Sequence, residues 1–234
     1  MKRIGIVSAM DDEIKFLISK LDFYEEEVIN NFTFYKSVLS FNDKKVELVI
    51  SKSGIGKTAA GMLLATLNNN FKVDAVINTG ICGGRLNHSN LGDVIVMDKC
   101  FYGDFSIAEI SDCAFGQIPG MPLAYESPEW LKKYAHGAII GDLLTTDRFV
   151  TSFEGTEALV NEYFSSYNVC GYDMESAAFA HACQFFNIPF IAIRATSDVV
   201  GVSSSDDYND NEVDLCKVSS EYLYGYLLRI VNDL

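Results

Sequence analysis

The sequence predicts an α/β protein, a three-layer sandwich in which a central mixed, largely parallel sheet is flanked by helices. Runs rich in Val and Ile alternate with stretches of helical periodicity along the 234 residues, as expected for an α/β sandwich. Apolar residues make up 49% of the chain, which is enough to fill a large core. We expect residues 1–234 to form a single domain.

The predicted elements alternate along the chain. The expected strands are 3–8, 46–51, 75–79, 93–98, 138–144 and 190–195. The expected helices are 12–21, 57–67, 128–134, 153–164, 174–186 and 212–231. Residues 32–39 and 44–50 are predicted to pair as a hairpin that turns at Asn42-Asp43. The polar segment 201–211 is predicted to be a loop, either a mobile lid or a solvated connection.

The charge of the chain argues against one class of partner. The net charge is −14 and no basic patch occurs, so the phosphates of a nucleic acid would be repelled. A nucleoside, which carries no phosphate, is not excluded. No stretch of 18 apolar residues occurs, so we expect no membrane span.

The cysteines and histidines lack the spacing of metal ligands. The six cysteines form no C-x-x-C pair, and the three histidines lie far apart in the sequence. Because Lys2-Arg3-Ile4 enters a predicted strand at once, we expect no secretory segment and reduced, mostly buried cysteines. The sequence therefore predicts a cytoplasmic protein without a metal or a cofactor.

Two glycine-rich segments follow predicted strands. Residues 53–58, Ser-Gly-Ile-Gly-Lys-Thr, imitate a P-loop, but that pattern requires glycine at the position of Ser51. A tight strand-to-helix turn is the better interpretation. Residues 78–84, Asn-Thr-Gly-Ile-Cys-Gly-Gly, lack the spacing of a dinucleotide fingerprint. We predict a second turn, whose glycines either let the backbone approach a ligand or serve the turn alone.

Two acidic positions point to acid/base chemistry. The run Asp173-Met174-Glu175 opens a predicted helix, and Asp198 follows an almost purely apolar strand. Carboxylates at the carboxyl ends of buried strands lie where α/β proteins bind small polar ligands.

Two further segments are ambiguous when each is taken alone. Glu13 follows the first strand, where acidic residues usually cap a helix or interact with its dipole. Phe149 follows another strand and fits either a core position or a platform for a flat ring.

Together, in this order and spacing, these segments resemble the bacterial 5′-methylthioadenosine/S-adenosylhomocysteine nucleosidases of the purine nucleoside phosphorylase-like superfamily. The similarity covers almost the whole chain and runs through residues 4–13, 53–57, 78–80, 116–120, 173–175 and 194–198. It implies the nucleoside phosphorylase-like fold, and it reverses the interpretation of Glu13 as a mere cap.

The resemblance also implies roles for individual residues. Asp198 resembles the general acid at N7 of adenine, Glu13 the group that polarises the attacking water, and Glu175 the carboxylate that holds the ribose hydroxyls. Phe149 is implied to stack on the base, Val150 to offer backbone groups to its edge, and Met174 to pack on the sugar. The other implied substrate-binding residues are Met10, Ile55, Ile81, Asp173, Arg194, Ser197 and Tyr208.

The reaction explains why these residue types are needed. Cleavage of an N-glycosidic bond passes through an oxocarbenium-like sugar, adenine leaves well only when an acid neutralises it, and water needs a base on the opposite face. Asp198 must therefore be protonated at working pH, and we expect burial among carboxylates to raise its pKa.

The chain departs from the family pattern at several positions. Ile81 stands where a small residue, often Ser, is usual, and Thr146 replaces a common Gly. Asp173 replaces Glu of some relatives, and residues 101–106 differ from the usual His-Asp-containing stretch. These changes leave the 5′-substituent preference open.

Three alternatives remain at this stage: a phosphorylase, a nucleoside-binding protein without turnover, and a nucleosidase for futalosine-type compounds. A phosphorylase needs a cationic cradle for phosphate, and Arg85 is the nearby candidate. The apolar segment 107–119, including Ile107 and Pro119, resembles the stretch that completes a neighbouring subunit's 5′ pocket. The resemblance therefore implies a homodimer.

Overall fold

The computed structural model describes residues 2–202 and 205–234, except for the side chains of 205–211. The elements are β1 (Arg3–Ser8), α1 (Asp12–Ser19), β2 (Glu25–Ile29), β3 (Phe32–Phe41), β4 (Lys44–Lys52), α2 (Lys57–Phe71), β5 (Ala75–Gly84), β6 (Val94–Tyr102), β7 (Tyr125–Glu126), α3 (Glu129–Lys132), β8 (Ile139–Thr145), α4 (Phe153–Tyr163), β9 (Val169–Asp173), α5 (Ser176–Phe186), β10 (Phe190–Val199) and α6 (Ser205–Asn232).

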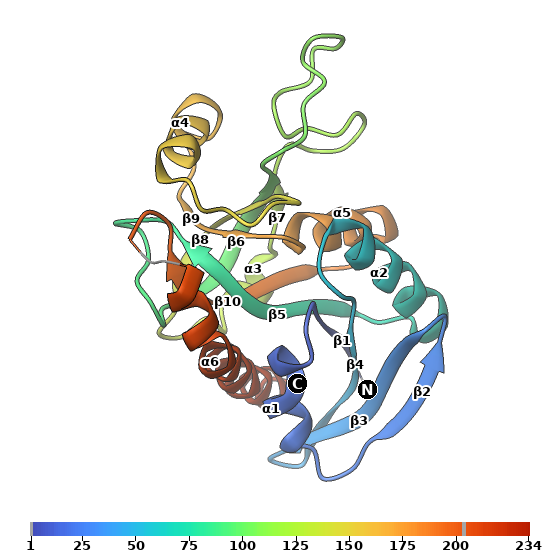
Figure 1. Ribbon diagram of the computed structural model, residues 1–234. Helices are drawn as coiled ribbons and strands as arrows, with labels where there is room; N and C mark the ends of the chain where they lie inside the picture. The colour runs from blue at the N-terminus through green and yellow to red at the C-terminus, as the bar shows by residue number, and fades with distance from the viewer. Residues whose placement is uncertain (1, 203–204) are drawn as a thin grey trace.

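Helices cover both faces of a central sheet (Figure 1). Helices α2 and α5 pack together on one face, while α1 and α6 pack together on the other. The predicted α/β class with a central mixed sheet and flanking helices is therefore confirmed. All six predicted helices and all six predicted single strands correspond to observed elements.

Part of the sheet closes on itself. The strand order is β10-β6-β8-β9-β5-β1-β4-β3-β2, and β10 also pairs with β5, so that β10, β6, β8, β9 and β5 form a ring. The pairs β1–β4, β1–β5, β10–β5, β6–β8 and β8–β9 are parallel, while β10–β6, β5–β9, β6–β7, β3–β4 and β2–β3 are antiparallel. The sheet is thus less parallel than the sequence suggested.

The glycine-rich segment 78–84 is not a turn, contrary to our expectation. It is the second half of β5, which continues in extended form to Gly84. The glycines are needed because neighbouring elements approach the strand closely. A Cβ at Gly84 would lie 2.5 Å from Thr196 Cγ2 and 2.6 Å from Ser89 Oγ, and one at Gly80 would collide with the carboxylate of Glu13.

The predicted hairpin is confirmed and lies next to the edge of the sheet. Strands β3 and β4 pair antiparallel across the two-residue turn Asn42-Asp43, where both residues have positive φ (49° and 62°). Strand β2 then pairs with β3 alone among the described strands. Its first three residues are the exposed glutamates 25–27.

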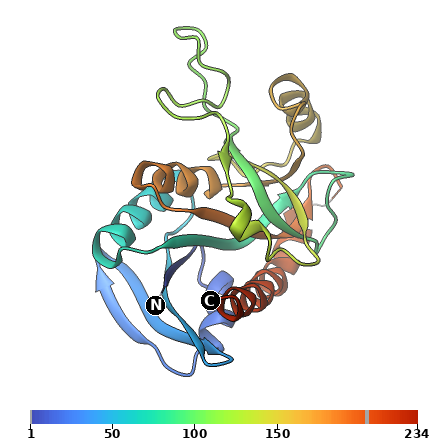
Figure 2. The ribbon, with the colours of Figure 1, turned by 180° about the vertical axis from the view of Figure 1, so that it is seen from behind.

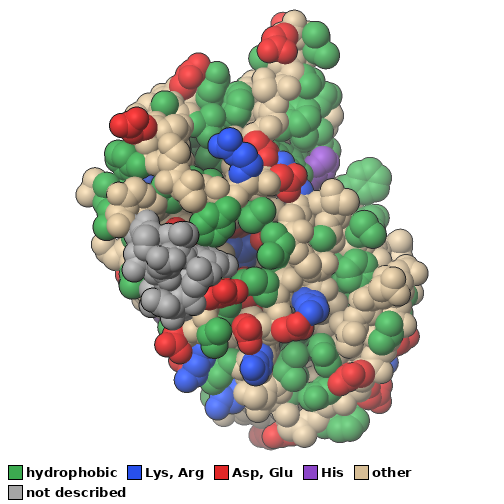
Figure 3. Space-filling view, viewed as in Figure 1, with side chains coloured by type: hydrophobic (Ala, Val, Ile, Leu, Met, Phe, Trp, Pro, Cys, Tyr) green, Lys and Arg blue, Asp and Glu red, His purple; other side chains and the backbone are tan. Residues whose placement is uncertain are grey.

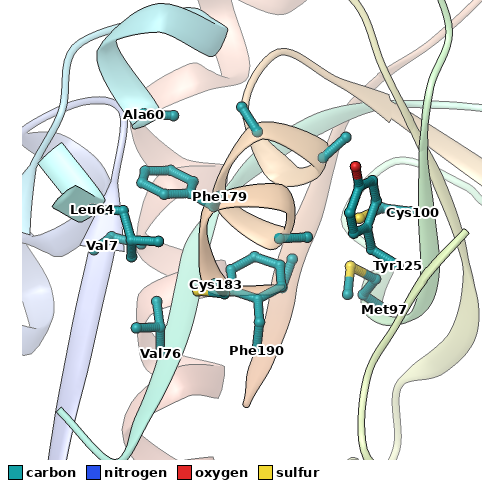
Figure 4. Close-up of a cluster of buried hydrophobic side chains, with 14 of the residues drawn as sticks. Val7, Ala60, Leu64, Val76, Met97, Cys100, Tyr125, Phe179, Cys183 and Phe190 are labelled. Atoms are coloured by element: carbon teal, nitrogen blue, oxygen red, sulfur yellow. The ribbon is translucent and has the colours of Figure 1, made fainter. Parts of the chain in front are cut away.

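Two hydrophobic clusters fill the space between the helices and the sheet. One lies under α2 and α5, where Leu64, Phe179 and Cys183 meet Val7 and Val76 of the sheet (Figure 4). The other lies under α1 and α6 and includes Ile6, Leu17, Leu227 and Ile230. Burial on both faces explains why residues 4–7 of β1 and 75–77 of β5 include no polar side chain.

Several boundaries differ from the sequence prediction. Helix α6 begins at Ser205, so most of the predicted loop 201–211 is helical. Residues 203–204 and the side chains of 205–211 lie outside the described part of the structure. The mobile lid therefore stays a prediction. Residues 169–173, predicted as no element, form β9, and α5 begins at Ser176 rather than at 174.

Residues 103–124 project from the same end of the molecule as α4 (Figure 2). Hydrophobic side chains gather along this projection (Figure 3). The apolar segment within it is only partly exposed: Ile110 is 85% exposed, but the ring of Phe115 stacks on Tyr163 with centroids 4.3 Å apart. Internal packing therefore accounts for Phe115 and leaves Ile110 as the large hydrophobic side chain of the segment that is exposed to water.

Other described features bear on the class of the protein. The helices among the described residues include none that is long and apolar enough to cross a membrane. All six cysteines carry free thiols, and five are buried. Within the described part, no group of three or more His, Cys, Asp or Glu side chains is arranged to hold a metal ion.

Candidate active site

A cavity opens where β1, β5, β9 and β10 end. Most of the side chains singled out in the sequence converge on it from loops and helix starts that are distant along the chain. The lining consists of Ala9, Met10, Glu13, Ile55, Ile81, Cys82, Gly83, Arg148, Phe149, Val150, Tyr172, Asp173, Met174, Glu175, Ser197 and Asp198.

Glu13 is fixed in this cavity by backbone amides. Its Oε2 accepts hydrogen bonds from the N–H groups of Ala9 (2.8 Å) and Met10 (2.9 Å), and its Oε1 accepts one from Ile81 (3.1 Å). Burial raises the pKa of Glu13, while the charge of Arg194 and these amides oppose the rise. The carboxylate is therefore held in a fixed orientation, and its pKa stays raised although these partners favour the anion.

Arg194 supplies the positive charge beneath the carboxylates. It is 1% exposed, and its Nη2 lies 2.9 Å from Oδ2 of Asp173. The same guanidinium donates to Asn78 Oδ1 and to Ser176 Oγ (2.9 Å). Asp173 also accepts from Thr145 Oγ1 (2.6 Å). The network holds Arg194 under the floor of the cavity, since Arg194 is not part of the lining.

Glu175 is held by the glycine-rich turn before α2. Its Oε1 accepts a hydrogen bond of 2.8 Å from the N–H of Gly56, whose φ is 99°. Burial, together with the charge of Asp173, raises the pKa of Glu175 to about 7. The next amide, Lys57 N–H, donates to Asp147 Oδ1 at 3.1 Å. Carboxylates of the chain itself thus occupy the amides that a phosphate would use in a P-loop, consistent with the predicted strand-to-helix turn.

Asp198 has a different environment. Strand β10 has an irregular register between Thr196 and Asp198, which turns the Asp198 carboxylate toward Gly83 of β5. Oδ1 accepts a hydrogen bond of 2.8 Å from Ser197 Oγ. Burial raises the pKa of Asp198, and among the described residues the Ser197 hydroxyl opposes the rise. The direction is the expected one, but the cause is burial rather than neighbouring carboxylates, because those cluster around Arg194.

The segment after β8 forms one wall of the cavity. The N–H of Thr146 donates to the carbonyl of Asp173 (2.9 Å), and its hydroxyl donates to the carbonyl of Arg148 (2.7 Å). These bonds present Phe149, which is 48% exposed, and the half-buried Val150 to the cavity. An aromatic ring at the mouth of a cavity suits stacking on a flat base.

The structure brings together most, but not all, of the predicted site. Met10, Ile55, Ile81, Met174 and Ser197 line the cavity with the three carboxylates and the 149–150 wall. Ile107 and Pro119 belong to the projecting segment and are not among the lining residues. Tyr208 belongs to segment 205–211, whose side chains lie outside the described part of the structure.

Sequence reasoning missed five lining residues, namely Ala9, Cys82, Gly83, Arg148 and Tyr172. Four of them are adjacent to a residue that was selected, and Gly83 lies two positions after Ile81, so proximity to the motifs was the available signal. Arg148 is the most consequential omission because it adds an exposed cation to the wall beside Phe149.

Comparisons with known proteins agree with this geometry. The sequence model of the phosphorylase superfamily matches residues 3–232. A 5′-methylthioadenosine/S-adenosylhomocysteine nucleosidase of Geobacillus sp. (strain WCH70) is 34% identical over 99% of both chains. The chain belongs to this nucleosidase family. The predicted resemblance is thereby confirmed.

Solved structures of the family superpose closely on this chain. The S-adenosylhomocysteine nucleosidase of Streptococcus pyogenes, in complex with 5-methylthiotubericidin, has a TM-score of 0.88 at 30% identity, covering 98% of this chain and 97% of its own. The nucleosidase of Colwellia psychrerythraea 34H, in complex with adenine, has a TM-score of 0.88 at 29% identity, covering 97% and 94%.

Proposed function

We propose that this protein hydrolyses the N-glycosidic bond of 5′-methylthioadenosine and S-adenosylhomocysteine, releasing adenine and the free thioribose sugar. The observation that carries this proposal is the placement of Glu13 and Asp198 in one cavity. They adjoin β5 at two different positions, Gly80 and Gly83. Two carboxylates that reach one cavity from different positions can serve as base and acid on a sugar held between them, as in inverting glycosidases.

The roles follow from the environments of the three carboxylates. Asp198, whose pKa is raised by burial, donates a proton to N7 of the leaving adenine. Glu13, supported as an anion, polarises the attacking water. Glu175 accepts hydrogen bonds from the ribose hydroxyls. Phe149 stacks on the base, Val150 contacts its edge, and Met174 packs on the sugar.

Water is a better nucleophile here than phosphate. Arg85, the candidate for a phosphate cradle, is engaged with Glu157 through two hydrogen bonds of 2.7 and 2.8 Å. The amides around Glu13 and Gly56 are occupied by carboxylates, which would repel an anion. Arg148 is the cation in the described lining, and it stands beside Phe149 in the wall on the proposed base side.

Product analysis decides between hydrolysis and its alternatives. Incubation with methylthioadenosine should release adenine at the same rate with and without phosphate, and the rate should survive exhaustive chelation. Strict phosphate dependence with a sugar 1-phosphate as product would establish phosphorolysis instead. A panel that includes futalosine-type nucleosides ranks the 5′-substituents, and binding without turnover would identify a nucleoside-binding protein.

The same proposal includes a cytoplasmic homodimer in which segment 107–119 completes the neighbour's 5′ pocket. The free thiols accord with a reducing compartment, and the exposure of Ile110 supports an apolar contact. We expect a mass near twice 25.9 kDa in solution. Ile110→Asp is the variant for testing assembly, because a charge at Phe115 would also break its contact with Tyr163. A fully active monomer in sedimentation at assay concentration would refute the dimer.

A further inference from the structure

Lys57 connects three segments that surround the cavity without lining it itself. Its Nζ lies 2.5 Å from Oδ1 of Asp104 and 3.4 Å from Oδ2 of Asp147. Its N–H donates to Oδ1 of Asp147, and the N–H of Asp147 donates to Oδ2 of Asp104 at 2.7 Å. One ammonium thus joins the start of α2, the root of the projecting loop and the segment after β8.

Each of the joined segments has a neighbour in the cavity. Gly56, immediately before Lys57, donates to Glu175. Arg148, Phe149 and Val150, immediately after Asp147, form the wall beside the base site. The position of Lys57 therefore sets the distance between the carboxylate proposed to hold the ribose and the ring proposed to stack on adenine.

We infer that Lys57 is a positioning residue for nucleoside binding, which keeps the 146–150 wall in register with Glu175. This inference rests on the proposed function only in the identity of the ligand. Lys57 does not touch Glu13 or Asp198, so its effect should fall on binding of the nucleoside rather than on the chemical step.

The charges explain why a neutral side chain cannot substitute. Without the ammonium, the carboxylates of Asp104 and Asp147 would face each other with like charge. The side chain of Asp104 is 26% exposed and that of Asp147 is 53% exposed, so water and salt screen part of that repulsion but not all of it. The wall would then move away from the root of the projecting loop.

Three variants and one control separate this role from a general effect on folding. Lys57→Met removes the charge, Lys57→Arg retains it, and Lys57→Met combined with Asp147→Asn removes the resulting repulsion. The control is Lys36→Met, because Lys36 likewise holds two carboxylates, Glu25 (3.2 Å) and Glu27 (3.1 Å), on the edge strands away from the cavity.

Steady-state kinetics with methylthioadenosine is the first measurement. Lys57→Met should raise KM about tenfold with kcat within about twofold of the unaltered protein. Lys57→Arg and the double variant should recover most of that loss, and Lys36→Met should leave both constants unchanged. Unaltered KM in Lys57→Met, or an equal rise in Lys36→Met, would refute the positioning role.

Trypsin cleavage after Arg148 is the second measurement, and it does not depend on the substrate. Release of the wall should increase the initial rate of this cleavage, identified by fragment mass, about fivefold or more in Lys57→Met, because cleavage of a native protein reports local opening. The double variant should return to the original rate. If the unaltered protein shows no turnover, the proposed function is wrong, but the cleavage rate still tests the positioning role of Lys57. An unchanged cleavage rate in Lys57→Met would refute that role.

Discussion

Two buried carboxylates of the cavity, Glu13 and Asp198, have opposite surroundings. At one end, Glu13 receives three backbone N–H groups and lies within the field of Arg194. At the other end, Asp198 receives one hydroxyl, that of Ser197, and no cation appears among the causes of its pKa shift. Both side chains are more than nine-tenths buried, so burial alone does not distinguish them.

The difference bears on the proposed division of the two carboxylates into a base and an acid. At Glu13, amides and a guanidinium oppose the rise in pKa that burial causes, as the proposed base requires. At Asp198, burial raises the pKa and so favours the protonated form that the proposed acid requires. The proposed assignment thus rests on the partners of each carboxylate and not on residue type.

The largest expected effect on turnover comes from replacing either Asp198 or Glu13. Asp198→Asn should lower kcat by roughly 10²–10⁴-fold, because the amide cannot protonate adenine. Glu13→Gln should cause a loss of similar size while nucleoside binding, measured by calorimetry, persists. Near-normal turnover in either variant would show that the two ends do not act as base and acid.

Replacing Arg194 by an uncharged residue should reduce the difference between the surroundings of Glu13 and those of Asp198. Arg194→Met leaves Asp173 buried without its partner, so the free energy of unfolding should fall by about 3–5 kcal/mol. Loss of the positive field should also raise the pKa of Glu13, so the acidic limb of the kcat/KM profile should move to higher pH. Arg194→Lys retains the charge and should keep that limb near its original position; a limb that does not move in the folded Met variant contradicts the proposed role of the cation.

A variant of Glu175 tests how much the burial of a third carboxylate of the cavity lowers the free energy of unfolding. Its pKa is raised from 4.5 to about 7, so it stabilises the fold fully below pH 4.5 and loses that contribution as pH rises toward 7. Glu175→Gln mimics the protonated form and should raise the free energy of unfolding at pH 8 by about 1–3 kcal/mol. Denaturant titrations at pH 8 and at pH 4.5 should show the gain at pH 8 and little at pH 4.5; an equal gain at both would point to another cause.

The smallest expected effect concerns the pKa of Asp198, the proposed acid. Ser197→Ala removes the hydroxyl that opposes the rise in the pKa of Asp198. The pKa should therefore increase further, and the alkaline limb of kcat/KM should move to higher pH by about half to one unit. The acidic limb, set by Glu13, should stay in place. A shift of the alkaline limb to lower pH would contradict this account.

Elements with a clear apolar period were predictable from the sequence, whereas closure of the sheet was not. Residues 75–79 read as a buried strand, but the glycines that follow resemble a turn unless the crowding at Gly80 and Gly84 is known. The short strand β9 escaped because its five residues include a glycine and lie close to a helix. The start of α6 escaped because residues 205–211 are as polar as a loop.

The candidate site was predictable to the extent that its residues sit next to strand ends. Family resemblance then selected Glu13, whose local sequence alone suggests a cap. Direction could not be predicted: Ser197 and Asp198 are consecutive on β10, where alternation places side chains on opposite faces, yet both line the cavity because the register of the strand is irregular there. Only the packed structure fixes which way each side chain of β10 points.

The acidic edge strand has a consequence for how this protein behaves in concentrated solution. The exposed backbone of β2 is a template on which another strand could add, and Val28 within it and Phe23 just before it are exposed apolar side chains. Glutamates 25–27 oppose such addition by charge repulsion between copies. As the pH falls toward the isoelectric point of about 4.5, the net charge of −14 approaches zero, so the general repulsion between copies weakens and we expect this edge to be a first point of association.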